Sequence, residues 1–343
     1  MLNRSLDISA PIVLLTVVSL LVLYSTAEQL FPTYLVFILL GFAAFYVFSR
    51  IDFEVLSLFS WHFYFISMAL LILTLAIGQI TRGAIRWIPI GSLSFQPAEL
   101  VRPFLLVFFA NYLTRRELTR QSLVRGMLLV VLPVLLIIIQ PSLGVSILTA
   151  VGFVGVILAS GISKRMFIYS ILGGIAMIPV AWFLLAPYQK DRIVSFINPE
   201  ADPSGAGYNS IQSMIGVGSG KIFGRGLGRG VQTQLSFLPE RHTDFIFASI
   251  SEELGMVGSL IVVGLLAFLV LSLTASIEGA SSFSSRAFIS GVMLYLLVQS
   301  VVHIGMNVGL MPVTGLPLPL VSAGGSSYIA TMIALGMVVG ARK

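Results

Sequence analysis

Long runs of apolar residues constrain the fold of this chain more than any other feature. About ten such runs, each of roughly 16–24 residues, are long enough to cross about 30 Å of hydrocarbon as helices. Composition agrees, because 57% of the 343 residues are hydrophobic and only 10% are charged. The sequence therefore predicts a single all-α polytopic membrane domain over residues 1–343, with about ten transmembrane helices.

The expected spans follow one another with short connections, except for one long hydrophilic segment, 188–244, before the eighth span. Because many spans follow the first run, we interpret that run as a transmembrane helix and not as a cleaved signal peptide. The absence of cysteine excludes disulfides and thiolate metal sites. The expected spans are 10–27, 32–48, 60–79, 98–113, 124–140, 143–161, 166–187, 250–274, 287–309 and 325–341.

Basic residues in the short loops predict the orientation. With ten spans, most of them fall on one side, and the positive-inside rule then places both termini in the cytoplasm. The segments 80–97, 188–244 and 310–324 would face outward. This distribution explains the net charge of +6 without any nucleic acid. The residues on the predicted inner side are Arg4, Arg50, Arg115, Arg116, Arg120, Arg125, Lys164, Arg165, Arg286, Arg342 and Lys343, against Arg82, Arg86 and Arg102 outside.

The outer segment 80–97 mixes polar and apolar residues and carries Trp87, a residue type that favours the membrane interface. An interfacial re-entrant turn is one interpretation. Glu99 falls in the first turn of the next span, and Arg102 lies on the same helix face. The two would form either a structural ion pair or the lining of a polar cavity.

The outer segment 188–244 is unusually basic. The orientation of the chain does not require cations in this segment. They therefore predict that the segment binds phosphate, either of membrane headgroups or of a lipid-linked phosphate or pyrophosphate. The glycine run 218–230 lacks the spacing of a P-loop and predicts a flexible loop. A short amphipathic segment, 211–217, precedes it. The cations are Lys190, Arg192, Lys221, Arg225, Arg229 and Arg241.

The third outer segment, 307–327, is apolar but interrupted by prolines and glycines. Broken backbone at membrane depth persists only where protein buries it or water lines it. Because interrupted segments mark binding sites in many transporters, a transporter remains an alternative function.

Asp244 is the first candidate for chemistry, because an acid at the edge of lipid is costly unless it is paired, hydrated or used. The histidines give no support for a nucleophilic triad or a metal site. Glu252 or Glu253 could share a helix face with Asp244, as in a paired-carboxylate hydrolase. A single acid beside several cations fits a different role better than a carboxylate pair: a general base that takes the proton from a sugar hydroxyl. Cations, or a divalent metal such as Mg²⁺ or Mn²⁺, would then stabilise a departing pyrophosphate.

Several motifs in the same order resemble the SEDS family over nearly the whole chain. Two segments, 188–192 and 199–203, are most similar to its elongation branch, RodA, rather than to FtsW. The motifs are Arg86-Trp87, Phe95–Glu99, Gly207–Ser213, Leu238–Ala248, Glu252–Gly255, Leu310–Pro319 and Gly324–Ser327.

The resemblance implies a ten-helix peptidoglycan glycosyltransferase of the bacterial cytoplasmic membrane. It would polymerise lipid II, a disaccharide-pentapeptide on undecaprenyl pyrophosphate, with Asp244 taking the proton from the acceptor 4-hydroxyl. Glu99 and Arg102 match an acid–base pair of the family's central cavity. The implied partners are a class B penicillin-binding protein transpeptidase, MreC and MreD. The substrate-binding candidates are Arg86, Trp87, Gln96, Glu99, Arg102, Lys190, Arg192, Gln212, Arg225, Gln234, Glu240, Arg241, His242, Thr243 and Ser322.

Three positions depart from the family pattern: Ser142 stands where an Asp is common, Ala323 where a Tyr is common, and Arg102 where Lys is usual. None of them alters Asp244, so we still expect activity, although Arg differs from Lys in geometry. Two alternatives to the polymerase stay open. One is a lipid II flippase or other lipid carrier, and the other is a scaffold that only recruits the transpeptidase.

Overall fold

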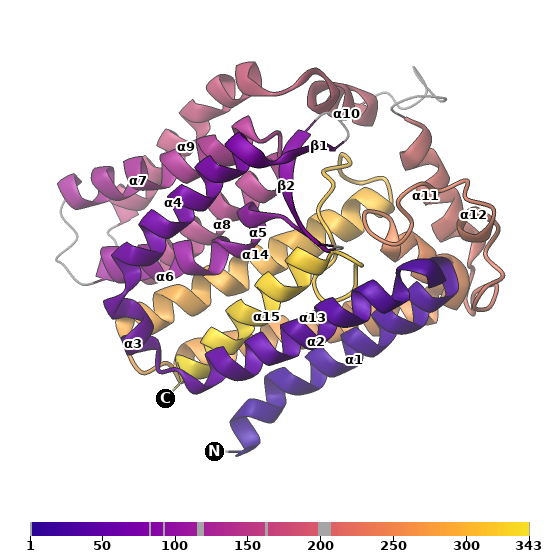
Figure 1. Ribbon diagram of the computed structural model, residues 1–343, viewed down its shortest axis with the longest axis horizontal. Helices are drawn as coiled ribbons and strands as arrows, with labels where there is room; N and C mark the ends of the chain where they lie inside the picture. Colours follow the sequence, from indigo (N-terminus) through magenta and orange to yellow (C-terminus); the bar gives the residue numbers. More distant parts are fainter. Residues whose placement is uncertain are drawn as a thin grey trace. The chain divides into compact units, whose positions relative to one another are not determined.

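The computed structural model describes residues 2–81, 84–91, 93–114, 120–161, 164–197 and 207–342 (Figure 1). Within these ranges nearly all regular structure is helical, and each predicted apolar run lies in a helix, so the all-α polytopic fold class is confirmed. The helices that hold the runs are α1 (Leu2–Thr26), α2 (Phe31–Arg50), α4 (Ser60–Ile77), α6 (Arg102–Thr114), α7 (Arg120–Ile139), α8 (Leu143–Ala159), α9 (Lys164–Leu184), α13 (Ile246–Glu278), α14 (Phe283–Asn307) and α15 (Gly325–Gly340).

The helices differ in length and in how much of their surface is exposed. In the described part of the chain, 6 stretches are long and apolar enough to cross a membrane. α6 is shorter, at 13 residues, and nearly all of its side chains are buried in protein. A helix enclosed in this way contacts its neighbours rather than lipid. The 6 stretches are Ile8–Thr26, Glu28–Arg50, Ser60–Ile77, Gln121–Ile139, Ile246–Glu278 and Phe283–Asn307.

Short helices fill much of the remaining chain. The predicted outer segment 188–244 contains α10 (Pro187–Ile197), α11 (Tyr208–Ser219) and α12 (Val231–Gln234). The amphipathic segment 211–217 lies within α11. The other short helices are η1 (Glu28–Leu30), α3 (Phe53–Leu58) and α5 (Pro97–Leu100). The sequence-based interpretations of Arg82, Arg115, Arg116, 199–203 and Lys343 lie outside the described residues.

The segment 80–97 corrects one expectation, because it forms strands rather than a re-entrant turn. β1 (Gln79–Thr81), β2 (Ala84–Ile90) and β3 (Leu93–Phe95) make an antiparallel sheet in that order. Trp87 pairs with Gln79, and Ile88 pairs with Phe95. Isoleucine and tryptophan fit a pleated surface well, which favours a strand over a turn here.

The chain divides into two compact units, which we describe separately. The first consists of Met1–Ile38, Pro187–Ser272 and Leu297–Tyr328, and it contains Asp244. The second consists of Leu39–Ala186, Leu273–Leu296 and Ile329–Lys343, and it contains Glu99 and Arg102.

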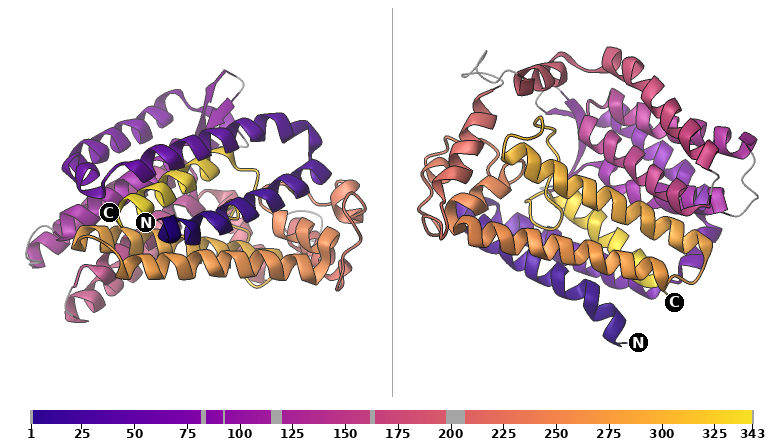
Figure 2. Two further views of the ribbon diagram at one scale, coloured as in Figure 1. Left: turned by 90° about the horizontal axis from the view of Figure 1, so that it is seen from below. Right: turned by 180° about the vertical axis from the view of Figure 1, so that it is seen from behind.

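One helix, α13, is unusually long at 33 residues, and Figure 2 shows it in orange from two further directions. Its backbone is not helical at Gly255, where φ is 69° and ψ is −164°. Glycine adopts this conformation without the steric penalty that a side chain would bring. The helix is therefore broken two turns after the segment that carries Asp244.

Candidate functional site

Asp244 lies in a tight turn that leads into α13. Glu240 begins the turn with a φ of 54°, and its carbonyl oxygen accepts hydrogen bonds from the N–H groups of Thr243 (3.1 Å) and Phe245 (3.2 Å). Phe245 and Leu238 anchor the two ends of the turn in a buried apolar cluster. The side chain of Asp244 is only partly buried, so the turn presents a carboxylate that a ligand can reach.

Asn307, at the end of α14, holds this turn in place. Its Nδ2 donates to the carbonyl oxygen of Asp244 (3.1 Å), and its Oδ1 accepts from the N–H of Ala248 (3.0 Å). Ser213 donates in turn to the carbonyl oxygen of Asn307 (2.9 Å). Asn307 is fully buried, and sequence analysis did not select it as a site residue. Its only sequence signal is a polar residue at the end of an apolar span.

Replacing Asn307 with alanine is expected to lower the turnover number about tenfold while leaving the KM for the substrate unchanged. The change leaves two backbone groups without partners and lets the Asp244 carboxylate shift from its productive position. Ser213→Ala is the matched control, because it removes a buried hydrogen bond to the same residue but none to the turn. Equal losses in both variants would show that Asn307 has no special relation to Asp244.

The interrupted segment 308–324 is bonded to the same turn. Ser322 Oγ donates to the carbonyl oxygen of Thr243 (2.7 Å). The N–H of Ala323 donates to the carbonyl oxygen of His242 (2.9 Å). The Tyr34 hydroxyl donates to the carbonyl oxygen of Ser322 (3.0 Å). Three of the predicted residues thus meet, but His242 and Thr243 do so through main-chain atoms. Their binding of substrate stays a prediction.

Gly315 marks the place where a cation approaches Asp244. A Cβ atom built on Gly315 would lie 3.3 Å from Nη1 of Arg192 and 3.5 Å from Oδ2 of Asp244. The guanidinium comes from α10 and the carboxylate from the turn before α13. The structure therefore brings a predicted acid and a predicted cation together against a bare stretch of backbone.

Replacing Gly315 with alanine is expected to reduce the rate of the reaction, because the methyl group would lie 3.3 Å from Nη1 of Arg192, closer than ordinary contact, and would displace that guanidinium. Gly315 also has a φ of 68°, so alanine adds backbone strain of about 1 kcal/mol. Gly161→Ala separates the two effects, since Gly161 has a φ of 71° but no atom near its Cβ position. Comparing initial reaction rates and melting temperatures of both variants tests this. Similar losses of rate in both would mean that strain alone is responsible.

Glu252 and Glu253 bind the glycine run and not Asp244, so the structure does not support a carboxylate pair. Glu252 is fully buried and accepts hydrogen bonds from the N–H groups of Gln232 (2.9 Å) and Thr233 (3.0 Å). Glu253 accepts from Ser25 Oγ (2.6 Å). Both acids lie inside α13, whereas Asp244 precedes that helix, and this difference separates their partners.

The other candidates of the first unit occupy different surroundings. Gln234 donates its amide to Glu253 Oε1 (3.1 Å). Arg241 bonds to the carbonyl oxygen of Thr26 (3.0 Å) and to Ser236 Oγ (2.8 Å). These bonds give both side chains a structural role beside the predicted binding role. Lys190 lies on α10, Gln212 on α11, and Arg225 on the glycine run.

The second unit holds a buried polar cluster around Glu99 and Arg102. Both side chains are at most 5% exposed, and Glu99 interacts electrostatically with Arg102 and Arg86. The guanidinium of Arg102 lies 5.2 Å from the ring centre of Tyr295. Within the described residues, Nε and Nη2 of Arg102 have no hydrogen-bond partner. Unpaired buried donors are costly, so they favour a ligand or water cavity over a closed ion pair.

Two further predicted residues lie near the edge of this cluster. Gln96 Nε2 donates to Ser142 Oγ (3.0 Å), so the serine at the departure from the family pattern serves as an acceptor. Trp87 is half-buried on β2. No group of three or more His, Asp or Glu side chains able to hold a metal occurs in the described part of the chain.

Sequence comparison connects these residues to known proteins. A family described as "cell cycle protein", which groups FtsW, RodA and SpoVE, matches residues 5–343. Peptidoglycan glycosyltransferase MrdB of Escherichia coli K12 is 42% identical over 282 residues, which cover 81% of this chain and 76% of the relative. The probable peptidoglycan glycosyltransferase FtsW of Aliivibrio salmonicida is 34% identical over 313 residues, covering 89% and 78%.

Solved structures give the same result at the level of the fold. A chain from a peptidoglycan synthase complex, studied for the coordination of polymerization and crosslinking, aligns with a TM-score of 0.84 and 31% identity. The rod shape-determining protein RodA of Thermus thermophilus aligns with a TM-score of 0.75 and 28% identity. Both alignments cover 98% of this chain and 96% of the other chain.

Proposed function

Because the chain belongs to the family of FtsW, RodA and SpoVE, we propose that it is a peptidoglycan glycosyltransferase that polymerises lipid II during cell elongation. The observation that carries this proposal is the meeting of Asp244 and Arg192 beside Gly315. A general base and a cation at one place match the two demands of glycosyl transfer from a pyrophosphate donor. The Nε and Nη2 groups of Arg102, which have no hydrogen-bond partner among the described residues, could bind a sugar or phosphate group.

In the proposed mechanism, Asp244 takes the proton from the 4-hydroxyl of the acceptor GlcNAc. The hydroxyl oxygen attacks the anomeric carbon of the donor MurNAc as the bond to the undecaprenyl pyrophosphate oxygen breaks, which inverts that carbon. Arg192 stabilises the negative charge that develops on the leaving group.

A divalent cation such as Mg²⁺ or Mn²⁺ would add to the charge of Arg192. Mg²⁺ is commonly held by one or two carboxylates together with substrate phosphates, and Asp244 could supply the protein ligand. When bound, the metal would screen the pyrophosphate as it departs. The comparison of polymerisation with and without a chelator tests this requirement.

The orientation and partners follow from the same proposal. We propose that Arg50, Arg125 and Arg286 face the cytoplasm, as the positive-inside rule predicts from the sequence, and that Asp244 faces the outside of the cytoplasmic membrane. The similar chain from a peptidoglycan synthase complex supports a class B penicillin-binding protein as the crosslinking partner. MreC and MreD are further proposed partners, supported by the resemblance to the elongation branch.

The decisive experiment compares wild type and Asp244→Ala with the transpeptidase present. A polymerase requires that Asp244→Ala still folds and binds the transpeptidase but makes no glycan from lipid II. The irregular segment 308–324 favours a lipid carrier as the second candidate, which would move labelled lipid II across vesicles regardless of Asp244. If the protein were only a scaffold, cells would grow with either aspartate or alanine at position 244. Normal glycan synthesis by Asp244→Ala would refute the proposed mechanism.

A further inference from the structure

The glycine run 218–230 lies beside the break in α13, where the apolar part of that helix begins. The part of α13 after the break at Gly255 extends to Glu278, which is about 23 residues or about 35 Å at 1.5 Å per residue. This length matches the hydrocarbon thickness of about 30 Å. Met256 and Leu260, at its beginning, are 52% and 60% exposed, as expected for residues that face lipid. The break therefore marks one edge of the hydrocarbon.

The glycine run is fixed at this depth by the break itself. The carbonyl oxygens of Lys221 and Ile222 accept from the N–H groups of Met256 (2.9 Å) and Val257 (3.2 Å). On the other side of the break, the N–H of Arg225 donates to the carbonyl oxygen of Glu252 (2.9 Å). Backbone groups at the edge of lipid need such internal partners. The expected flexible loop is thus corrected to a segment held in one conformation.

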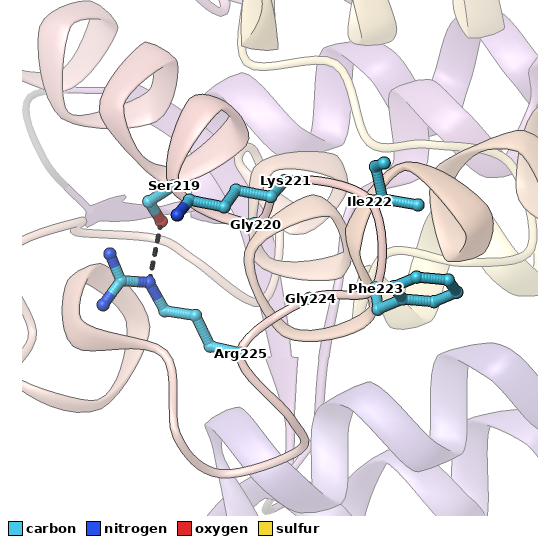
Figure 3. A pocket seen from close by; sticks show the side chains of 7 residues that line it. All are labelled: Ser219, Gly220, Lys221, Ile222, Phe223, Gly224 and Arg225. Atoms are coloured by element: carbon cyan, nitrogen blue, oxygen red, sulfur yellow. Dashed lines mark hydrogen bonds between the residues drawn. The ribbon is translucent and has the colours of Figure 1, made fainter.

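The side chains of the run combine apolar and cationic character. Phe223 is 82% exposed and Ile222 is 52% exposed, while Lys221 and Arg225 are exposed cations. Figure 3 shows the apolar pair on one side of the run and the ends of Lys221 and Arg225 on the other, near Ser219. This arrangement suits an interface, where aromatic groups enter the acyl region and cations remain at the phosphates.

The run borders an open hollow of about 550 Å³ that is lined by Ser219–Arg225, and thus by both the cations and the apolar pair. Arg225 Nε donates to Ser219 Oγ (3.2 Å), which orients the guanidinium and leaves its two terminal amino groups to a ligand. A guanidinium offers two parallel donors to a phosphate, and the nearby ammonium of Lys221 adds a second charge. The hollow contains no residue of the Asp244 turn, α10 or the segment 308–324.

We propose that this hollow binds the phosphate of an anionic phospholipid of the surrounding bilayer, with Phe223 and Ile222 inserted among its acyl chains. The charge of the hollow favours an anionic over a zwitterionic headgroup. The apolar tip favours a lipid over a free phosphate. The site is independent of the proposed role of Asp244. Its occupancy would fix the membrane depth of α13 and hence of the turn that α13 follows.

The test measures lipid retained by the purified protein in native mass spectrometry after incubation with phosphatidylglycerol or phosphatidylcholine. We expect wild type to retain phosphatidylglycerol preferentially and Lys221→Gln to lower this preference about fivefold, the effect of one cation near an anionic surface. Lys221→Arg should keep the preference. Phe223→Ser should weaken retention of both lipids, since Phe223 contacts the chains and not the headgroup.

Arg229→Gln is the matched control, because it removes one exposed charge from the same run outside the hollow. An equal loss in Lys221→Gln and Arg229→Gln would overturn the site, since general charge would then explain the preference. Equal retention of the two lipids by wild type would also overturn it. If Lys221→Gln raised the KM for lipid II but retained phosphatidylglycerol normally, the hollow would belong to the substrate and the proposal would be wrong. Inorganic phosphate that displaced phosphatidylglycerol at millimolar concentration would show that no lipid chains are recognised.

Discussion

Replacing Asp244 with asparagine is expected to reduce glycan polymerisation by about 10²–10⁴-fold, the usual contribution of a positioned general base. Asparagine has nearly the same size as aspartate, and the turn is held by main-chain atoms, so the fold should persist. The bond from Asn307 Nδ2 to the carbonyl oxygen at position 244 does not depend on the side chain that is changed. What disappears is the ability to accept a proton beside Arg192.

Initial rates of polymerisation with purified lipid II and the transpeptidase partner provide the measurement. Asp191→Asn is the matched control, because Asp191 is an exposed acid on α10, next to Arg192 in the chain. It should retain nearly full activity. A loss below tenfold in Asp244→Asn would mean that proton transfer to this carboxylate does not limit the reaction. A comparable loss in Asp191→Asn would indicate that overall negative charge, and not a positioned base, matters.

Replacing Glu252 with alanine is expected to destabilise the first unit by about 1–3 kcal/mol for each buried backbone donor that loses its partner. Its carboxylate accepts from two backbone N–H groups at the start of α12, and Ser219 Oγ lies 3.5 Å from it. Alanine leaves those buried donors without partners. The glycine run, which also bonds to the backbone of α13, would lose one of its attachments.

The melting temperature of the detergent-solubilised protein tests this expectation. Glu278→Ala is the control, because Glu278 lies at the exposed end of the same helix, and it should shift the melting temperature little. Glu252→Gln should be intermediate, since an amide keeps one acceptor oxygen but turns a donor toward a backbone N–H. Equal melting temperatures for wild type and Glu252→Ala would show that the carboxylate is not the anchor that its hydrogen bonds suggest.

Hydrophobic runs sufficed to predict the helices because crossing a bilayer demands length and apolarity, and both are properties of the local sequence. The predicted spans follow from this rule. The strands of the segment 80–97 were not predicted, because they depend on pairing between residues that no local sequence pattern connects. The broken helix α13 was also missed, since Gly255 lies inside an apolar run and its partners come from residues 221–226.

The sequence by itself determined that Asp244 lies beside a membrane span and that cations cluster in the same hydrophilic segment, 188–244. Only the tertiary structure decided which cation approaches the acid, because Arg192 and Gly315 are far from Asp244 along the chain. It also assigned Glu252 to the glycine run and gave Asn307 its position at the turn. Such choices depend on buried hydrogen bonds between distant segments, and no local pattern encodes them.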